Sequence, residues 1–330
     1  MRQIPVPIAP PDQQKRIAAE IEKQFSRLDE AVANLKRVKA NLKRYKAAVL
    51  KAAVEGKLTE EWREAHPDVE PASELLKRIL AERRATWEKT QLARMKIKGK
   101  IPKDDEWKKK YKESSLGQRV QRWQLPHCWT SATIGQVSEC LDSMRVPVNK
   151  KDRLKREGQI PYYGANGQVG WINDYLFDEP LVLVVEDETF IGRTIAFSYK
   201  IKGKSWVNNH AHVLRATEAV EVDFLNYSLM YYPFTPLTTG TTGRRKLTQQ
   251  VLMVAPYRLP PVAEQLQIVL EVERRVSIIE DLEHIVTASF RRAEKLRQSV
   301  LERAFSRTLY NLTIVPFNED EGNVPSAQMD

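Results

Sequence analysis

Two distant segments of the chain carry an apolar residue at every seventh position. The first segment contains Ile21, Leu28, Leu35, Leu42 and Val49, and the second contains Val272, Ile279, Val286, Ala293 and Val300. A heptad pattern sustained this long is typical of helices that pack as coiled coils. A helix of about 44 residues spans roughly 65 Å and needs a partner for its apolar stripe. We therefore expect the two helices to pack against each other.

The two segments also match each other residue by residue. Residues 8–58 align with residues 258–309 and, after a one-residue adjustment, run in register at an offset of 251 positions, so that Ile17 pairs with Ile268 and Leu50 with Leu301. Each begins with two prolines, which the first turn of a helix tolerates. A single repeat at so long a period indicates a duplicated unit separated by a domain. An intervening domain allows the helices to pack antiparallel, although two unrelated amphipathic helices remain an alternative.

The region between the helices has two parts. In residues 59–122, prolines break the chain, a helix is expected from residue 72 or 73 to about residue 95, and a lysine-rich, loosely ordered stretch follows. Residues 123–256 alternate β-branched runs with glycines, which predicts strands joined by turns. The predicted organisation is a first heptad helix in 1–58, a basic helical or loop insertion in 59–122, a mixed domain in 123–256, a second heptad helix in 257–310 and a disordered tail in 311–330.

The positive charge of the chain is concentrated in one place. Residues 72–122 hold 16 Lys and Arg against 7 Asp and Glu, which accounts for +9 of the net charge of +10. A basic arm on an otherwise balanced protein suits contact with a polyanion, and a solvated linker is the alternative interpretation. The chain has two cysteines, lacks an apolar signal segment at its start and has no membrane-spanning apolar run. We expect a cytoplasmic protein with no membrane contact.

Several short motifs occur in a characteristic order. They are Leu125-Pro126 with Trp129, then Thr133-Ile134-Gly135, then residues 161–167, and last Leu259-Pro260-Pro261 with Glu264-Gln265. Together with the repeat, they resemble the specificity subunits of type I restriction–modification systems. The resemblance covers nearly the whole chain except residues 59–122 and the tail. Because residues 4–11 look like the end of a missing recognition domain, the chain resembles the C-terminal half of such a subunit, or a half-subunit.

The resemblance implies a fold and a set of partners. The fold is α+β, with one α/β target-recognition domain flanked by two long helices, conserved in the family, that pack as an antiparallel coiled coil. Such a chain reads one DNA half-site, and its helices dock the modification subunits. It is not an enzyme and binds no cofactor: S-adenosylmethionine, ATP and Mg²⁺ belong to the methyltransferase and helicase–nuclease partners. Two half-subunits, as a homodimer or as two different chains, would restore the two-domain arrangement. A fragment that acts only as an assembly module is the alternative.

Enzymatic motifs are not legible in the sequence. Neither Pro10-Pro11 nor Pro260-Pro261 has the flanking residues of a methyltransferase motif, and Gly203-Lys204-Ser205 lacks the upstream glycine of a phosphate-binding loop. The acidic run 186–188 could hold Mg²⁺ for a nuclease, but no suitably spaced lysine follows it. His210 and His212 with Cys128 and Cys140 do not fit zinc-ligand spacings. We expect no metal site, and a stand-alone nuclease is the least favoured alternative.

Three clusters in the predicted domain combine cations with amide and hydroxyl side chains. Lys and Arg contact phosphates, whereas Asn and Gln can pair with adenine and Arg with guanine. The candidate DNA-binding residues are Arg145, Lys150, Lys151, Tyr163, Asn166, Gln168, Thr241, Thr242, Arg244, Arg245 and Lys246. For each of them, an ordinary role in a turn or as a surface charge is the alternative.

Overall fold

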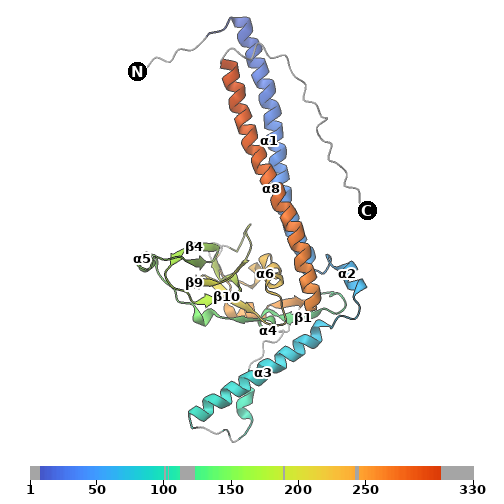
Figure 1. Ribbon diagram of the computed structural model, residues 1–330, viewed down its shortest axis with the longest axis vertical. Coiled ribbons are helices and arrows are strands. Elements are labelled where there is room, and N and C mark those ends of the chain that lie inside the picture. The colour runs from blue at the N-terminus through green and yellow to red at the C-terminus, as the bar shows by residue number, and fades with distance from the viewer. Residues whose placement is uncertain are drawn as a thin grey trace. The chain divides into compact units, whose positions relative to one another are not determined.

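A computed structural model describes residues 8–99, 102, 104–111, 123–188, 190–241 and 245–305. The chain divides into two compact units (Figure 1): one combines Met1–Arg44 with Ile279–Asp330, and the other is Tyr45–Ile278. The expected tail and the stretch 112–122 lie outside the described residues, as do Thr242 and Arg244. The predicted fold class, an α+β chain with two long terminal helices, is confirmed.

The two heptad segments form helices α1 (Pro11–Val54) and α8 (Val262–Phe305), each of 44 residues. In the first unit, Leu42 is buried with Ile279 and Val286, and Leu35 packs on them. Arg297 forms an ion pair with Asp29 further along. Since positions rise along one helix as they fall along the other, the helices run antiparallel. Of the other seam residues of this unit, Ala293 is buried, and Ile21, Leu28 and Val300 are half-buried.

In the second unit, the first sheet has the antiparallel order β2-β10-β6-β8. Its strands are β2 (Ser138–Cys140), β6 (Leu181–Val185), β8 (Ser198–Ile201) and β10 (Ala211–Ala216). All five residues of β6 are buried. From Leu181 to Val184 the side chains alternate between two cores, with Val182 and Val184 in one and Leu181 and Leu183 in the other. Helix α6 (Val222–Met230) contributes to the first core, which also includes Val49 of α1 and Val272 of α8.

A second sheet, ordered β4-β3-β9-β5, shares the other core. It consists of β3 (Ile160–Gly164), β4 (Gly167–Ile172), β5 (Phe177–Asp178) and β9 (Lys204–Val207). Strands β3 and β4 form a hairpin, whereas β3 and β9 are parallel. The short helix α5 (Lys150–Leu154) lies against β4, where Arg153 would be 3.3 Å from a Cβ at Gly170. A side chain at position 170 would therefore crowd Arg153.

Short elements join these sheets to the long helices. Strands β1 (Thr130–Thr133) and β13 (Pro256–Leu259), which come from the beginning and the end of the domain sequence, pair with each other. Helix α4 (Ile134–Val137) follows β1, and α7 (Gln249–Val254) precedes β13. A small sheet joins β7 (Asp187–Glu188), β11 (Thr239–Gly240) and β12 (Arg245–Lys246). The 3-10 turns η2 and η3 cover Asp142–Met144 and Thr235–Leu237.

The insertion contains more helix than loop among its described residues. It forms α2 (Glu60–Ala65), α3 (Ala72–Ile97) and the 3-10 helix η1 (Glu106–Lys110). Helix α3 begins where the sequence predicts it and continues two residues past the expected end. Among the described helices, none combines the length and the apolarity needed to cross a bilayer.

Candidate nucleic-acid interface

The carboxylate of Glu264, in the first turn of α8, joins the domain to the helices of its unit. Glu264 is 1% exposed and accepts hydrogen bonds from the indole N–H of Trp129 and the hydroxyl of Thr59, both at 2.8 Å. The guanidinium of Arg63 completes the set at 2.8 Å. A buried charge is tolerated when it is paired and fully hydrogen-bonded. Glu264 therefore has a structural role that the motif around it did not reveal.

The neighbouring Gln265 fixes the domain in a similar way. Its amide donates to the carbonyl oxygens of Ala219 and Pro260 at 2.9 Å, and its oxygen accepts from the backbone N–H of Glu221 at 2.7 Å. Below this contact, Gly56 has a φ of 73° and lies so close to Pro126 that a Cβ would be 2.8 Å from its ring. The end of α1 thus requires glycine for both conformation and space.

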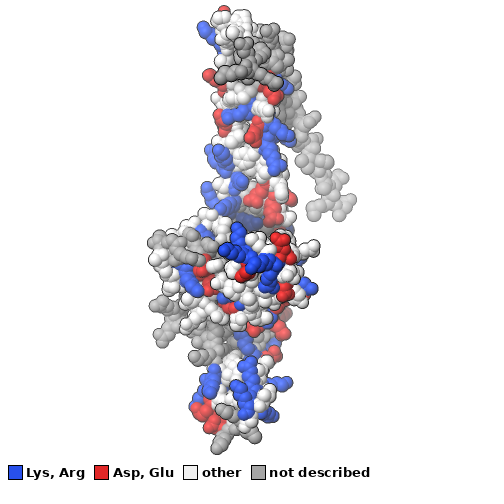
Figure 2. All heavy atoms as spheres, turned by 90° about the vertical axis from the view of Figure 1, so that its left-hand side faces the viewer, with Lys and Arg blue, Asp and Glu red and all other residues white. Residues whose placement is uncertain are grey.

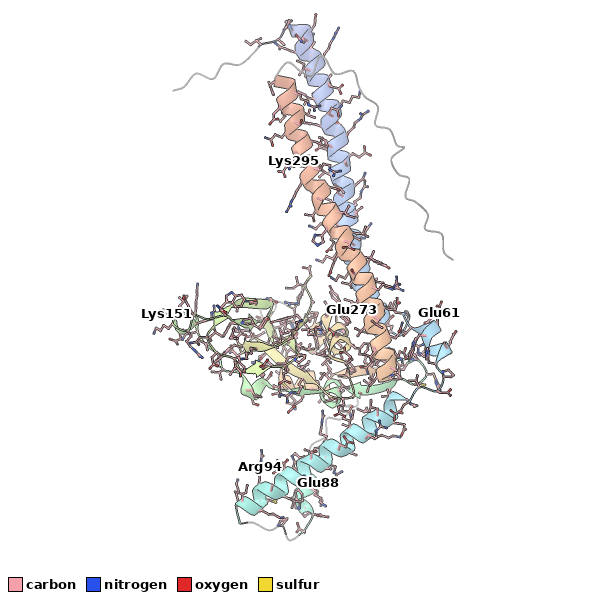
Figure 3. All side chains as sticks on the ribbon, in the orientation of Figure 1. Glu61, Glu88, Arg94, Lys151, Glu273 and Lys295 are labelled. Atoms are coloured by element: carbon pink, nitrogen blue, oxygen red, sulfur yellow. The ribbon has the colours of Figure 1, made fainter. Side chains whose placement is uncertain are left out.

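Lys150 and Lys151 lie on α5 with exposed side chains and form no ion pair among the described residues. Figure 2 shows Lys and Arg gathered on the side of the domain that carries α5, and Figure 3 shows Lys151 pointing outward there. Two arginines hold the helix in place, since Arg153 lies 4.6 Å from the ring centre of Tyr162 and Arg156 lies 4.5 Å from that of Trp206. The two lysines remain available to a ligand.

The β3–β4 hairpin exposes two of the predicted amides beside α5. Asn166 accepts a hydrogen bond from Arg193 at 2.7 Å, and Gln168 donates to the carbonyl of Gly170 at 3.2 Å. Both side chains are exposed. Tyr163 is half-buried, with its ring centre 6.1 Å from that of Tyr199. The hairpin therefore presents Asn166 and Gln168 outward, while Tyr163 packs against the sheet.

In the third cluster, one of the three described candidates is turned toward the protein. Arg245 donates to the hydroxyl and the carbonyl oxygen of Thr238, both at 2.6 Å. The ammonium of Lys246 is 3.0 Å from Glu186, although its side chain is 56% exposed. Thr241 is exposed. In this cluster Thr241 and Lys246 are the described side chains that remain accessible.

Arg145 departs from the role expected of it. Its side chain is 12% exposed and donates to Glu186 and to the carbonyl oxygen of Ala211, both at 2.6 Å, and it lies 3.2 Å from Asp142. In the sequence it stands near the lysines of α5, but the fold places it against two buried carboxylates. Because its guanidinium neutralises them, we remove Arg145 from the DNA-binding candidates.

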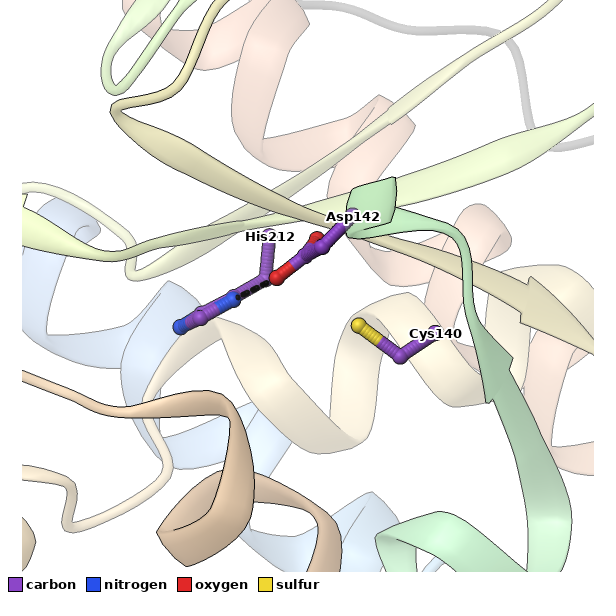
Figure 4. A group of neighbouring side chains, drawn as sticks. All are labelled: Cys140, Asp142 and His212. Carbon is purple, nitrogen blue, oxygen red and sulfur yellow. Dashed lines mark hydrogen bonds and ion pairs between the residues drawn. The ribbon is translucent and has the colours of Figure 1, made fainter. Parts of the chain in front are cut away.

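Figure 4 shows the next layer of this cluster, where Cys140, Asp142 and His212 have ligand atoms within 4.8 Å of one another. Burial raises the pKa of Asp142, but hydrogen bonds from His212 and from the Val213 N–H, with the charge of Arg145, outweigh it and leave the pKa lowered. His212 Nδ1 lies 2.5 Å from this carboxylate and Nε2 lies 2.8 Å from the Leu247 carbonyl oxygen.

The two neighbours of the His212 ring are oxygen atoms of the protein, one on each ring nitrogen, so both nitrogens are engaged in hydrogen bonds within the fold. Burial also raises the pKa of the Cys140 thiol to about 12. Cys128 is placed elsewhere, with its sulfur 2.9 Å from His127. Asp142 and His212 therefore belong to a hydrogen-bonded cluster in which their polar atoms are engaged by other groups of the protein.

Comparisons with known proteins agree on one family. Residues 126–283 match the family described as "Type I restriction modification DNA specificity domain". A putative type I restriction enzyme specificity subunit of Haemophilus influenzae is 33% identical over 136 residues, which are 41% of this chain and 34% of that protein. The EcoKI specificity subunit of Escherichia coli K12 is 24% identical over 309 residues, which are 92% of this chain and 57% of that protein.

A solved structure has a related fold. It concerns complex assembly and conformational transition of the type I R-M system, and its chain superposes with a TM-score of 0.55 at 17% identity. The match covers 91% of this chain and 60% of that chain. At this identity the likeness shows the fold alone. The chain thus spans less than two thirds of the length of each of these relatives.

Proposed function

Because the chain belongs to the specificity subunits of type I restriction–modification systems, as its motifs predicted, we propose that its one α/β domain recognises a DNA half-site. The observation that carries the proposal is the exposed edge formed by α5 and the β3–β4 hairpin. There, α5 lies against β4 through Arg153 and Gly170. Lys150 and Lys151 of α5 are exposed without an ion pair among the described residues, and the hairpin exposes Asn166 and Gln168. Amides can pair with the edge of adenine, and lysines neutralise phosphates, so this edge has the chemistry for both tasks.

The chain is proposed to be non-catalytic within this system. Its concentrated group of ionisable side chains, Asp142, Arg145, Glu186 and His212, is engaged in holding the sheet and the β12 strand together. We infer that methyl transfer from S-adenosylmethionine is performed by a partner subunit. ATP-driven, Mg²⁺-dependent restriction belongs to a second partner.

We further propose that the start of α1 accepts a second recognition domain. Gln13, Gln14 and Ile17 are the repeat counterparts of Glu264, Gln265 and Ile268. The three α8 residues are covered by the domain and are at most 1% exposed. By contrast, Gln14 is exposed, and among the described contacts its amide donates to the carbonyl of Ala9. Ile17 is half-buried. A homodimer or a separate half-subunit would supply such a domain, and the long helices would then scaffold the modification subunits.

The test is methylation by the complex of this chain with its modification subunits. The expected result is methylation of one defined sequence. N166A/Q168A is expected to lose the preference for that sequence, because its base-reading amides are gone. K150Q/K151Q is expected to weaken binding to any duplex without changing the preference.

Two outcomes would count against the proposal. A complex that assembles but methylates no defined sequence would favour the alternative, a fragment that acts only in assembly. Mg²⁺-dependent cleavage of DNA by the purified chain would instead establish a nuclease.

A further inference from the structure

The second half of the insertion has more Lys and Arg side chains than ion pairs among its described residues. We define the arm as the described residues between Arg84 and Tyr111, which include the end of α3 and all of η1. Its ion pairs join Arg84 to Glu88, Lys108 to Asp105 and Lys109 to Glu106. Five further cations of the arm are exposed and pair with no carboxylate of the described residues: Lys89, Arg94, Lys96, Lys98 and Lys110.

An aromatic cluster gives the arm a fixed shape. Trp107 of η1 is 8% exposed, and its ring centre lies 6.0 Å from that of Trp87 on α3. The ring of Tyr111 lies 5.3 Å from Trp87, with the guanidinium of Arg84 6.0 Å from its centre. Stacked aromatic contacts of this kind stabilise a defined geometry. The described cations are therefore held on a folded element, which differs from the solvated linker that the charge alone also allowed.

The domain does not need the arm for its own core. The first half of α3 buries Ala72, Leu76 and Ile79 in the core of the domain, and Arg83 donates to the carbonyl of Gly135 at 2.8 Å. Beyond Arg83, Trp107 is the one buried residue among those described in the arm. Figure 1 shows α3 continuing past this anchor, away from the sheets. The positive charge of the arm is therefore not explained by packing against the domain.

We propose that the arm binds the phosphates of duplex DNA outside the half-site that the domain reads, without reading bases. The inference rests on the proposed DNA recognition. The aromatic rings of the arm are turned inward, and its exposed surface offers ammonium and guanidinium groups, which suit phosphates. Figure 2 shows Lys and Arg of the arm on the same face of this unit as those near α5. One duplex can therefore meet both sets.

Salt dependence measures such contacts directly. Each phosphate neutralised by a protein cation contributes about 0.9 to the slope of log K against log salt concentration. If Arg94, Lys96 and Lys98 each contact one phosphate, R94Q/K96Q/K98Q lowers the magnitude of the slope by about 2.7. Glutamine keeps a good helix propensity, so the end of α3 is retained. Arg94→Lys keeps the charge and is expected to leave the slope unchanged.

The matched control removes three exposed cations from α8. Arg291, Arg292 and Lys295 have no ion pair among the described residues, and R291Q/R292Q/K295Q changes the net charge equally. The full chain is titrated with KCl from about 50 to about 200 mM on duplexes of arbitrary sequence. One duplex is about 40 bp long and the other about 12 bp, close to one helical turn. Fluorescence anisotropy of the labelled duplex gives K.

The inference expects a reduced slope for the arm variant on the long duplex alone. On the short duplex, which cannot span both sites, the arm variant and the control are expected to agree. Equal slopes for the two variants on the long duplex would overturn the inference while leaving the proposed DNA recognition intact. If the arm variant lost binding to a protein partner while its salt slope on the long duplex stayed unchanged, the inference would also be overturned. The arm would then be a protein-docking surface. A wild-type chain that binds neither duplex would refute the proposed function itself.

Discussion

Replacement of Glu264 by alanine tests the junction between the domain and α8 most directly. The substitution leaves the Arg63 guanidinium, 17% exposed, and the Trp129 indole N–H without their acceptor. Removing one partner of a buried ion pair costs about 3–5 kcal/mol. Arg63 keeps its hydrogen bond to the Gly56 carbonyl at 2.6 Å, so we expect the lower part of this range, about 3–4 kcal/mol.

The measurement is thermal unfolding followed by circular dichroism. For a unit of this size, 1 kcal/mol shifts Tm by roughly 2–4 °C, so Glu264→Ala lowers Tm by about 6–16 °C. Glu271→Ala on the same helix is the control, because Glu271 pairs with Arg274 and Arg275 at the surface. Such exposed pairs contribute about 0–1 kcal/mol. Glu264→Gln keeps an acceptor for Trp129 and should fall between the two. Similar Tm values for Glu264→Ala and Glu271→Ala would refute a stabilising role of the buried network.

Two further predictions concern the charged cluster under the β12 strand. The pKa of Asp142 is lowered from 3.8, so its ionised form stabilises the fold above that pH, and this contribution is lost as the pH falls below it. Urea unfolding at pH 7 should therefore show Asp142→Asn to be less stable than wild type. The difference in unfolding free energy between the two should narrow toward pH 3. A gap that stays constant with pH would contradict this. Arg145→Gln should lower Tm, because it leaves the carboxylates of Asp142 and Glu186 without their cation. It should leave the salt dependence of DNA binding unchanged. An unchanged Tm with a reduced salt dependence would return Arg145 to the DNA-binding residues.

The long helices could be predicted from sequence because their signal is local and repeated. Five apolar residues at heptad spacing specify a helix and one face of it, and the repeat supplies a partner of the same length. Leu42, Ile279 and Val286 are buried together in the antiparallel pair. Strand β6, Leu181–Val185, is one of the β-branched runs whose local pattern predicts strands in residues 123–256. In contrast, the parallel pairing of β3 with β9 joins segments about 40 residues apart, and no local pattern specifies it.

The candidate site was harder to predict because the partners of its charges are distant in sequence. Arg145 and Glu186 are 41 positions apart, and Glu264 and Thr59 are 205 positions apart. A run of cations shows charge but does not show which of them the fold will neutralise. Asn166 and Gln168 were identifiable because a glycine-bounded turn exposes its side chains wherever the hairpin lies. Gly167, with a φ of 118°, marks that turn.

The polar contacts divide these residues into those that stabilise the domain and those whose side chains can be replaced without loss of stability. Glu264, Gln265 and Arg145 have buried polar atoms whose partners come from several elements, so a substitution there leaves other groups unpaired. Asn166 and Gln168 have exposed side chains with one hydrogen bond each among the described contacts. Substitutions at such surface positions usually change stability by about 0.5 kcal/mol or less. The exposed side chains of the hairpin can therefore change while the junction with α8 holds the domain in place. The proposed DNA recognition needs this property, because a target sequence can then change without a change of fold.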